Sequence, residues 1–256
     1  MGKVLPPCLR ALGREKLPAT LSLLKGKFRF VRLFKHDFFA VTALYEGPTG
    51  KAVLKVGRKV DFLGLPCGWI GRLLTNREVN QYRRLQDLDA VPRLLGRWGK
   101  HGFAHAYVEG HPMQKGERVG DDFFGRLRDA IDAIHRRDVA YVDLEKPQNV
   151  IVGDDGRPYL IDFQIAWHIP KRYGGNLWPA RVVLKCFQDA DRYHIAKLQR
   201  RTRPDQLSPD QLAATYRKPW YVDLHGWLTR PLTKFRRRTL ERLDGKPQTG
   251  ERGTMP

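Results

Sequence analysis

Two short apolar runs on either side of an Asp-Gly turn constrain the fold of this chain more than any other feature. The runs are residues 149–152 and 159–163, and the turn is residues 153–156. Apolar runs around such a turn predict an antiparallel hairpin. If the turn centres on residues 154 and 155, Asn149 and Asp162 lie at the same end of the hairpin. Their offset is about two residues, at ~3.4 Å per residue.

Asp143 lies six positions before Asn149 and is therefore expected at the same end of the hairpin. Two carboxylates and an amide oxygen suit a hard cation such as Mg²⁺, which proteins usually bind together with substrate phosphates. The pattern predicts a phosphotransferase-like site that contains Asp143, Asn149 and Asp162.

Five segments, in order along the chain, resemble the motifs of protein-kinase-like enzymes. They are the third-strand lysine at 53–55, its ion-pair partner Glu78, the hinge at 107–110, the catalytic loop with its preceding helix at 133–151, and the metal-binding strand at 159–164. The resemblance covers roughly residues 28–164. It implies an α+β fold of two lobes, with a small antiparallel-sheet N-lobe, a mainly helical C-lobe and no long activation segment.

The resemblance also implies roles for individual residues, with ATP and Mg²⁺ as cofactors. Asp143 would orient or deprotonate an acceptor hydroxyl, and Asn149 and Asp162 would hold Mg²⁺. Lys55, paired with Glu78, would hold the α- and β-phosphates. The remaining expected contacts are Lys146 with the γ-phosphate, Lys35 with the phosphates, and Tyr107, Val108 and Glu109 with the nucleotide at the hinge.

Several departures from the family pattern bear on catalysis. Asn149 follows Asp143 by one position more than usual, and the extra residue falls at Leu144 or Glu145. Gln164 replaces a glycine, and the phosphate-covering loop at 33–40 contains no glycine. Such departures are closer to Rio-type kinases and bacterial lipopolysaccharide-core sugar kinases than to eukaryotic-type regulated kinases.

We expect a peripheral segment at 1–26, the N-lobe at 27–110, the C-lobe at 111–244 and a disordered tail at 245–256. Alternating runs predict strands at 27–33, 40–45 and 51–56, and apolar periodicity predicts helices near 76–88 and 121–137.

Some polar residues have structural interpretations. Thr75 and Glu78 also match a capping box, in which the glutamate bonds a backbone amide at a helix start. His135 is interpreted as a surface or packing residue. A cluster on a predicted helix is interpreted as surface ion pairs rather than a substrate site: Asp189, Asp191, His194 and Lys197.

A net charge of +20 indicates anionic partners but does not choose among them. A basic amphipathic helix at 229–243 could lie on an anionic membrane surface or pack on the C-lobe. No apolar run approaches the ~20 residues that span a bilayer. We therefore expect a cytoplasmic protein, with peripheral contact to the inner face of the membrane as an option. The sequence does not indicate the oligomeric state.

The leading functional prediction is ATP- and Mg²⁺-dependent transfer of a phosphoryl group to a hydroxyl, on protein Ser/Thr or on a lipopolysaccharide-type sugar. The alternative is a catalytically inactive kinase fold that acts as a binding or regulatory protein. A third option, nucleic-acid binding, rests on charge alone and is disfavoured.

Overall fold

The computed structural model describes residues 7–23, 26–62, 65–170, 172, 174–220 and 222. The chain divides into two units, residues 1–216 and 217–256, and every described helix and strand lies in the first. This first unit includes described parts of both predicted lobes. The predicted basic helix at 229–243 and the tail at 245–256 lie outside the described residues.

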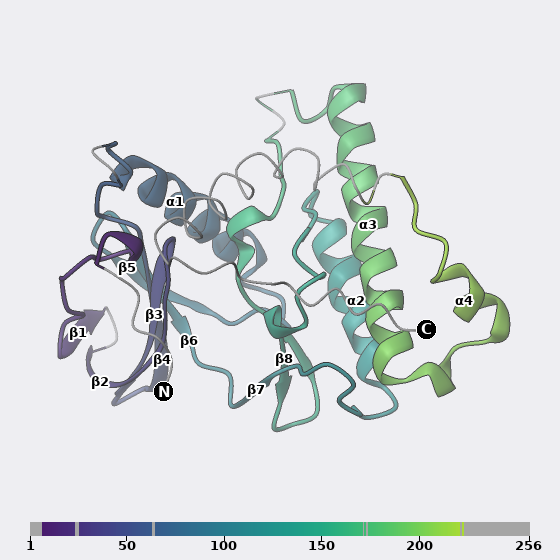
Figure 1. Cartoon of the computed structure of the whole chain (residues 1–256), viewed down its shortest axis with the longest axis horizontal. Helices are drawn as coiled ribbons and strands as arrows, with labels where there is room; N and C mark the ends of the chain where they lie inside the picture. The colour runs from purple at the N-terminus through teal and green to yellow at the C-terminus, as the bar shows by residue number, and fades with distance from the viewer. Residues whose placement is uncertain are drawn as a thin grey trace, which may run out of the picture. The chain divides into compact units, whose positions relative to one another are not determined.

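A six-stranded antiparallel sheet forms the N-terminal part of the fold, shown in purple to blue in Figure 1. Its strand order is β1-β2-β3-β4-β6-β5. The strands are β1 (Thr20–Leu23), β2 (Gly26–His36), β3 (Ala40–Gly47), β4 (Gly50–Gly57), β5 (Leu94–Trp98) and β6 (Gly102–Ala106). The three predicted strands of the N-lobe are thus confirmed as β2, β3 and β4.

Side chains along β3 and β4 point alternately to the two faces of the sheet, and the two faces differ in character. On one face, Ala43, Tyr45 and Leu54 belong to a buried apolar cluster. On the other face, Lys55 lies opposite Thr42 on β3 and Phe103 on β6. Because successive side chains of a strand point to opposite faces, the apolar register that buries Leu54 turns Lys55 to the other side of the sheet.

The described part of the N-terminal segment packs on the six-stranded sheet. β1 pairs with β2, with Leu21 opposite Phe28. Leu12 and Leu21 are buried in the same apolar cluster as the inner residues of β3 and β4. Residues 7–23 therefore cover one face of the sheet, because that face would otherwise expose its apolar side chains to water.

The C-terminal part of the fold is built around the predicted hairpin and three helices. The strands β7 (Gly110–Pro112), β8 (Val150–Gly153) and β9 (Pro158–Leu160) form a second antiparallel sheet in the order β7-β8-β9. The helices are α2 (Phe123–His135), α3 (Trp178–Thr202) and α4 (Pro209–Ala214). Val150 pairs with Leu160, and the amide of Ile161 donates to the carbonyl of Asn149. The hairpin is confirmed, but its register differs from the predicted one by one residue, since Ile151 lies opposite Tyr159. Asn149 and Asp162 still emerge at one end.

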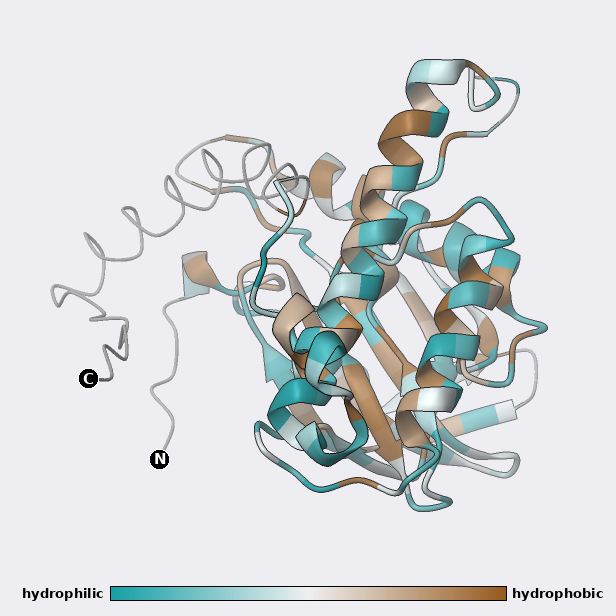
Figure 2. Cartoon of the chain, turned by 90° about the vertical axis from the view of Figure 1, so that its right-hand side faces the viewer, coloured by the Kyte–Doolittle hydropathy of each residue, from teal (hydrophilic) through white to brown (hydrophobic). Residues whose placement is uncertain are grey.

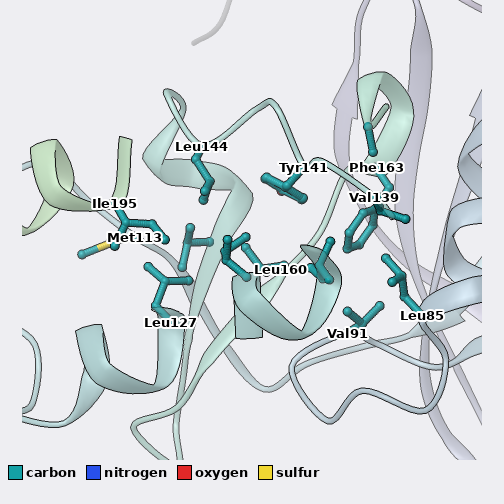
Figure 3. Close-up of a cluster of buried hydrophobic side chains, with 14 of the residues drawn as sticks. Leu85, Val91, Met113, Leu127, Val139, Tyr141, Leu144, Leu160, Phe163 and Ile195 are labelled. Carbon is teal, nitrogen blue, oxygen red and sulfur yellow. The ribbon is translucent and has the colours of Figure 1, made fainter. Parts of the chain in front are cut away.

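A large apolar cluster joins α1 (Gly68–Leu85) to the C-terminal part of the fold. Figure 3 shows how Leu85, Leu127, Leu160 and Ile195 contribute to it from α1, α2, β9 and α3. Along the helices in Figure 2, hydrophilic and hydrophobic residues alternate, as expected where one face is buried. Among the described residues, no helix is both long and apolar enough to cross a membrane.

The buried position of Leu21 gives a test of the role of the N-terminal segment. Leu21→Ala should lower the free energy of unfolding by about 2–4 kcal/mol, because it leaves a cavity in the sheet core. Ser22→Ala changes an exposed neighbour on the same strand and should change it by less than about 0.5 kcal/mol. Urea denaturation measures both, and equal effects would show that the segment does not cover the sheet.

Candidate active site

The side-chain amine of Lys55 lies at the centre of the candidate active site. Its Nζ is 2.8 Å from a carboxylate oxygen of Glu78 on α1. The same Nζ is 2.8 Å from Oδ1 of Asp162, just after β9. The side chain of Lys55 is 14% exposed and that of Glu78 is 2% exposed. Three elements that are distant in sequence therefore meet at one buried ammonium group.

Burial and the charges at this junction shift the pKa values of Lys55, Glu78 and Asp162. Burial alone would lower the pKa of Lys55, but the carboxylates of Glu78 and Asp162 raise it above its ordinary value. Burial raises the pKa of Glu78, and the charge of Lys55 opposes this shift. Burial would also raise the pKa of Asp162, but Lys55 holds it below its usual range, and Lys146 and Lys35 act in the same direction. At neutral pH Lys55 is therefore charged and Asp162 is ionised.

The position of Glu78 in α1 decides between its two interpretations. The capping box requires a helix start at Thr75, but α1 begins at Gly68 and both residues lie within the helix. The capping interpretation is therefore wrong, because amides in the middle of a helix are bonded within it. The carboxylate of Glu78 instead contacts Lys55.

Asp143, Lys146 and Asn149 form a second polar cluster. Oδ2 of Asp143 accepts a hydrogen bond from Lys146 Nζ at 2.7 Å and another from Asn149 Nδ2 at 2.8 Å. Burial raises the pKa of Asp143, and the bond from Lys146 opposes the shift. The charge of Asp162 also raises the pKa of Asp143, so the two carboxylates are close enough to interact.

The oxygen donors beside this cluster fit a divalent cation. Asn149 directs its Nδ2 toward Asp143, which leaves Oδ1 as the atom able to coordinate a metal. Asp162 is ionised and its side chain is 34% exposed. An amide oxygen and a carboxylate are typical Mg²⁺ ligands, and substrate phosphates and water usually complete the shell.

The extra residue of the catalytic loop does not separate these groups. Leu144 is buried in the apolar cluster, whereas Glu145 is exposed and contacts Lys197 on α3 at 3.6 Å. Residues 147–149 then form a short 3₁₀ turn that leads into β8. Despite the additional residue, both Lys146 and Asn149 reach Asp143.

The substitution of glycine by Gln164 is compatible with the backbone of this turn. Asp162 has a left-handed conformation, with φ of 63°, and residues 163–165 form a 3₁₀ turn. Among the described non-glycine residues, only Asp138, Val142 and Asp162 have positive φ. Asp tolerates this region better than most residues, and Gln164 does not need to enter it.

Edge-to-face contacts among three aromatic rings link α1 to the catalytic loop. The ring of Phe163 lies edge-on to Tyr82 of α1 and to Tyr141, with centroids 5.1 Å apart in each case. The hydroxyl of Tyr141 donates to the carbonyl of Ile161, immediately before Asp162. Tyr141 therefore fixes the strand end that carries Asp162.

Asp191 is a positioning residue that the sequence analysis misassigned to the surface. It is fully buried on α3 and accepts hydrogen bonds from the amides of Tyr141 at 2.8 Å and Val142 at 2.7 Å. It also contacts Nε2 of His135 at 2.9 Å. Val142 has φ of 72°, a strained conformation for a β-branched residue, so these bonds hold the backbone directly before Asp143.

A sequence signal for Asp191 exists in the spacing of α3. Its position shares a helix face with four buried apolar residues: Leu184, Phe187, Ile195 and Leu198. A carboxylate on such a face requires buried partners. Asp189, in contrast, forms the expected surface pairs with Lys185 and Arg192.

Lys35 and the hinge residues, which are expected to contact the nucleotide, each contact a neighbouring side chain. Lys35 Nζ is 2.6 Å from Oδ2 of Asp37. The ring of Tyr107 stacks on Phe34 of β2, with centroids 6.2 Å apart. Glu109 pairs with Lys51 at 2.8 Å. Their contacts with a nucleotide stay predictions.

The hinge also lines a cavity of about 570 Å³. Tyr107, Val108 and Glu109 form one wall, and residues from the α1–β5 connection and the β8–β9 turn form the others. Lys55, Asp143 and Asp162 do not line this cavity. The hinge ends at Gly110, where an added Cβ would lie 2.2 Å from the carbonyl oxygen of Val152, so only glycine fits there.

Comparison with solved structures identifies the architecture. The Rio2 kinase from Chaetomium thermophilum superposes with a TM-score of 0.52 and 17% identity, over 72% of this chain and 61% of that chain. Its ADP/Mg²⁺-phosphoaspartate complex gives the same score and identity over 75% and 63%. This chain has a protein-kinase-like fold. The predicted fold class is thereby confirmed.

Sequence comparison is consistent with a protein-kinase-like chain but covers less of it. A casein kinase I homolog of Encephalitozoon cuniculi is 28% identical over 131 residues, which are 42% of this chain and 41% of that protein. No protein-family model matches. This protein-kinase-like chain spans less than two thirds of the length of each of these proteins.

The contacts of Asp191 predict a large and specific effect on stability. Asp191→Ala leaves two buried amides and His135 without their acceptor, and should lower the free energy of unfolding by about 3–5 kcal/mol. Asp189→Ala, on the same helix, removes surface pairs and should cost at most about 1 kcal/mol. Urea denaturation compares the two, and similar losses would contradict a positioning role for Asp191.

Proposed function

We propose that this chain is an ATP- and Mg²⁺-dependent kinase that transfers the γ-phosphoryl group to a hydroxyl acceptor. The observation that carries the proposal is the double contact of Lys55 with Glu78 and Asp162, beside the cluster around Asp143. A fixed cation next to paired oxygen donors suits the binding of a triphosphate, because phosphoryl transfer depends on positioning and charge stabilisation.

Each residue has a role that follows from its surroundings. Lys55 holds the α- and β-phosphates, and Glu78 keeps its amine in place. Asn149 and Asp162 hold Mg²⁺, which supplies positive charge against the phosphate oxygens when bound. Asp143 orients the acceptor hydroxyl and accepts its proton, and Lys146 contacts the transferred phosphoryl group. The ADP and Mg²⁺ named for the Rio2 complex support these cofactors.

The acceptor is a serine or threonine of a protein or a hydroxyl of a lipopolysaccharide-type sugar. Both acceptors present the same chemical group to Asp143, so the roles above are identical for the two. The similarity to Rio2 and to the casein kinase I homolog supports the protein acceptor. The net charge of +20 supports an anionic acceptor of either kind.

A catalytically inactive nucleotide-binding protein is the second candidate. The specific observation in its favour is the turn between β2 and β3, where Asp37 already bonds the amides of Phe39 and Ala40. An inactive protein would be stabilised by ATP but would transfer no phosphate to any acceptor.

The proposal predicts distinct effects for the two aspartates. Mg²⁺ with ATP should raise the melting temperature of the wild type, since a ligand specific for the folded state stabilises it. Asp162→Asn should lose the Mg²⁺-dependent part of this shift. Asp143→Asn should keep the shift but lower the transfer rate by about 10²–10⁴-fold, the usual contribution of a proton-accepting group.

Thermal unfolding with ATP, with and without Mg²⁺, measures binding. Labelled γ-phosphate measures transfer to a serine/threonine peptide library and to a lipopolysaccharide core oligosaccharide. Asp129→Asn, on the exposed face of α2, is the control and should behave as wild type. Full activity of the Asp143→Asn, Asp162→Asn double variant would contradict the proposed mechanism.

A further inference from the structure

The turn between β2 and β3 contains an internal anion. Oδ1 of Asp37 accepts hydrogen bonds from the amides of Phe39 at 2.8 Å and Ala40 at 2.9 Å. Its other oxygen, Oδ2, is 2.6 Å from the amine of Lys35. At the tip of this hairpin, one carboxylate therefore accepts hydrogen bonds from two backbone amides and forms an ion pair with one lysine.

These donors are the groups with which the turn could bind phosphate. Consecutive backbone amides in a turn bind anions, and a lysine adds a full positive charge. Lys35 lies opposite Thr42 on β3, and Thr42 lies opposite Lys55 on β4, so Lys35 and Lys55 are on the same face of the sheet. The charge of Lys35 also lowers the pKa of Asp162. The tip of the hairpin thus lies within electrostatic reach of the candidate active site.

The backbone of the turn is held from a second side by Arg58, which follows β4. Its amide donates to the carbonyl of Phe39 at 2.8 Å, and its Nη1 donates to the carbonyl of Phe38 at 3.0 Å. Its guanidinium lies over the ring of Phe38, 4.0 Å from the centroid. With the backbone held in this way, rotation of the Asp37 side chain is the simplest way to release the amides.

We propose that Asp37 competes with the nucleotide phosphates for the two turn amides and for Lys35, and so lowers the affinity of the site. This inference rests on the proposed function. Binding of a triphosphate requires the carboxylate to rotate away, and the charge of Lys35 is neutralised until it does. Burial alone would raise the pKa of Asp37, but the bonds from Lys35 and the two amides lower it, so the competing group is an anion at neutral pH.

Asp37→Asn separates this role from a purely structural one. The amide oxygen of asparagine can still accept from the two turn amides and preserve the turn, but the negative charge is gone. The variant should bind ATP about five- to tenfold more tightly, as expected for removal of one partly exposed charge near the phosphates. Its affinity for adenosine, which has no phosphate, should match that of the wild type.

Lys35→Met provides an independent variant. In the wild-type background it should lower ATP affinity less than in the Asp37→Asn background, because the charge of Lys35 is already paired with Asp37. In the Asp37→Asn background it should remove most of the gain. This non-additivity is expected of two groups in direct contact.

Isothermal titration of the full chain with ATP and with adenosine measures the two affinities. Urea denaturation of each variant checks that it is folded. Tighter ATP binding by Asp37→Asn, with adenosine unchanged, supports the inference. Equal ATP affinity in the wild type and Asp37→Asn, or an equal loss from Lys35→Met in the two backgrounds, overturns it and leaves the proposed function intact. Failure of every variant to bind either ligand overturns both.

Discussion

Burial of the Lys55 amine is the constraint on which the candidate active site depends. Burial of an ammonium group raises the free energy of the folded state unless carboxylates pair with it. Removal of one partner leaves an unpaired buried charge and destabilises the fold. Here the compensation comes from Glu78 on α1 and Asp162 after β9. The sheet, the helix and the hairpin therefore meet at a single charge, and the same charge is suited to bind phosphate.

Apolar contacts support this polar junction from behind. The ring of Phe163 lies between Tyr82 and Tyr141, so the residue after Asp162 joins α1 to the catalytic loop. Asp191 then holds the amides of that loop and offsets the strained backbone at Val142. The charged groups are thus oriented by packing and by a buried acceptor, which is how a site keeps its geometry without a ligand.

The parts of the site that could be predicted from sequence are those fixed by local geometry. The apolar runs around the turn predicted the hairpin, and a hairpin brings Asn149 and Asp162 to one end even with the observed one-residue difference in register. The role of Asp191 depends on contacts about 50 residues away, which no local pattern contains. The two interpretations of Glu78 differ only in where α1 begins, and element ends are the least certain part of any pattern.

The departures from the kinase pattern have unequal consequences at the two sides of the site. In the catalytic loop, Lys146 and Asn149 both contact Asp143 despite the additional residue. In the turn between β2 and β3, which contains no glycine, the carboxylate of Asp37 accepts hydrogen bonds from the turn amides. Under the proposed function, this carboxylate adds negative charge beside the phosphates while the reacting groups stay in place, and it would therefore act on binding rather than on the chemical step.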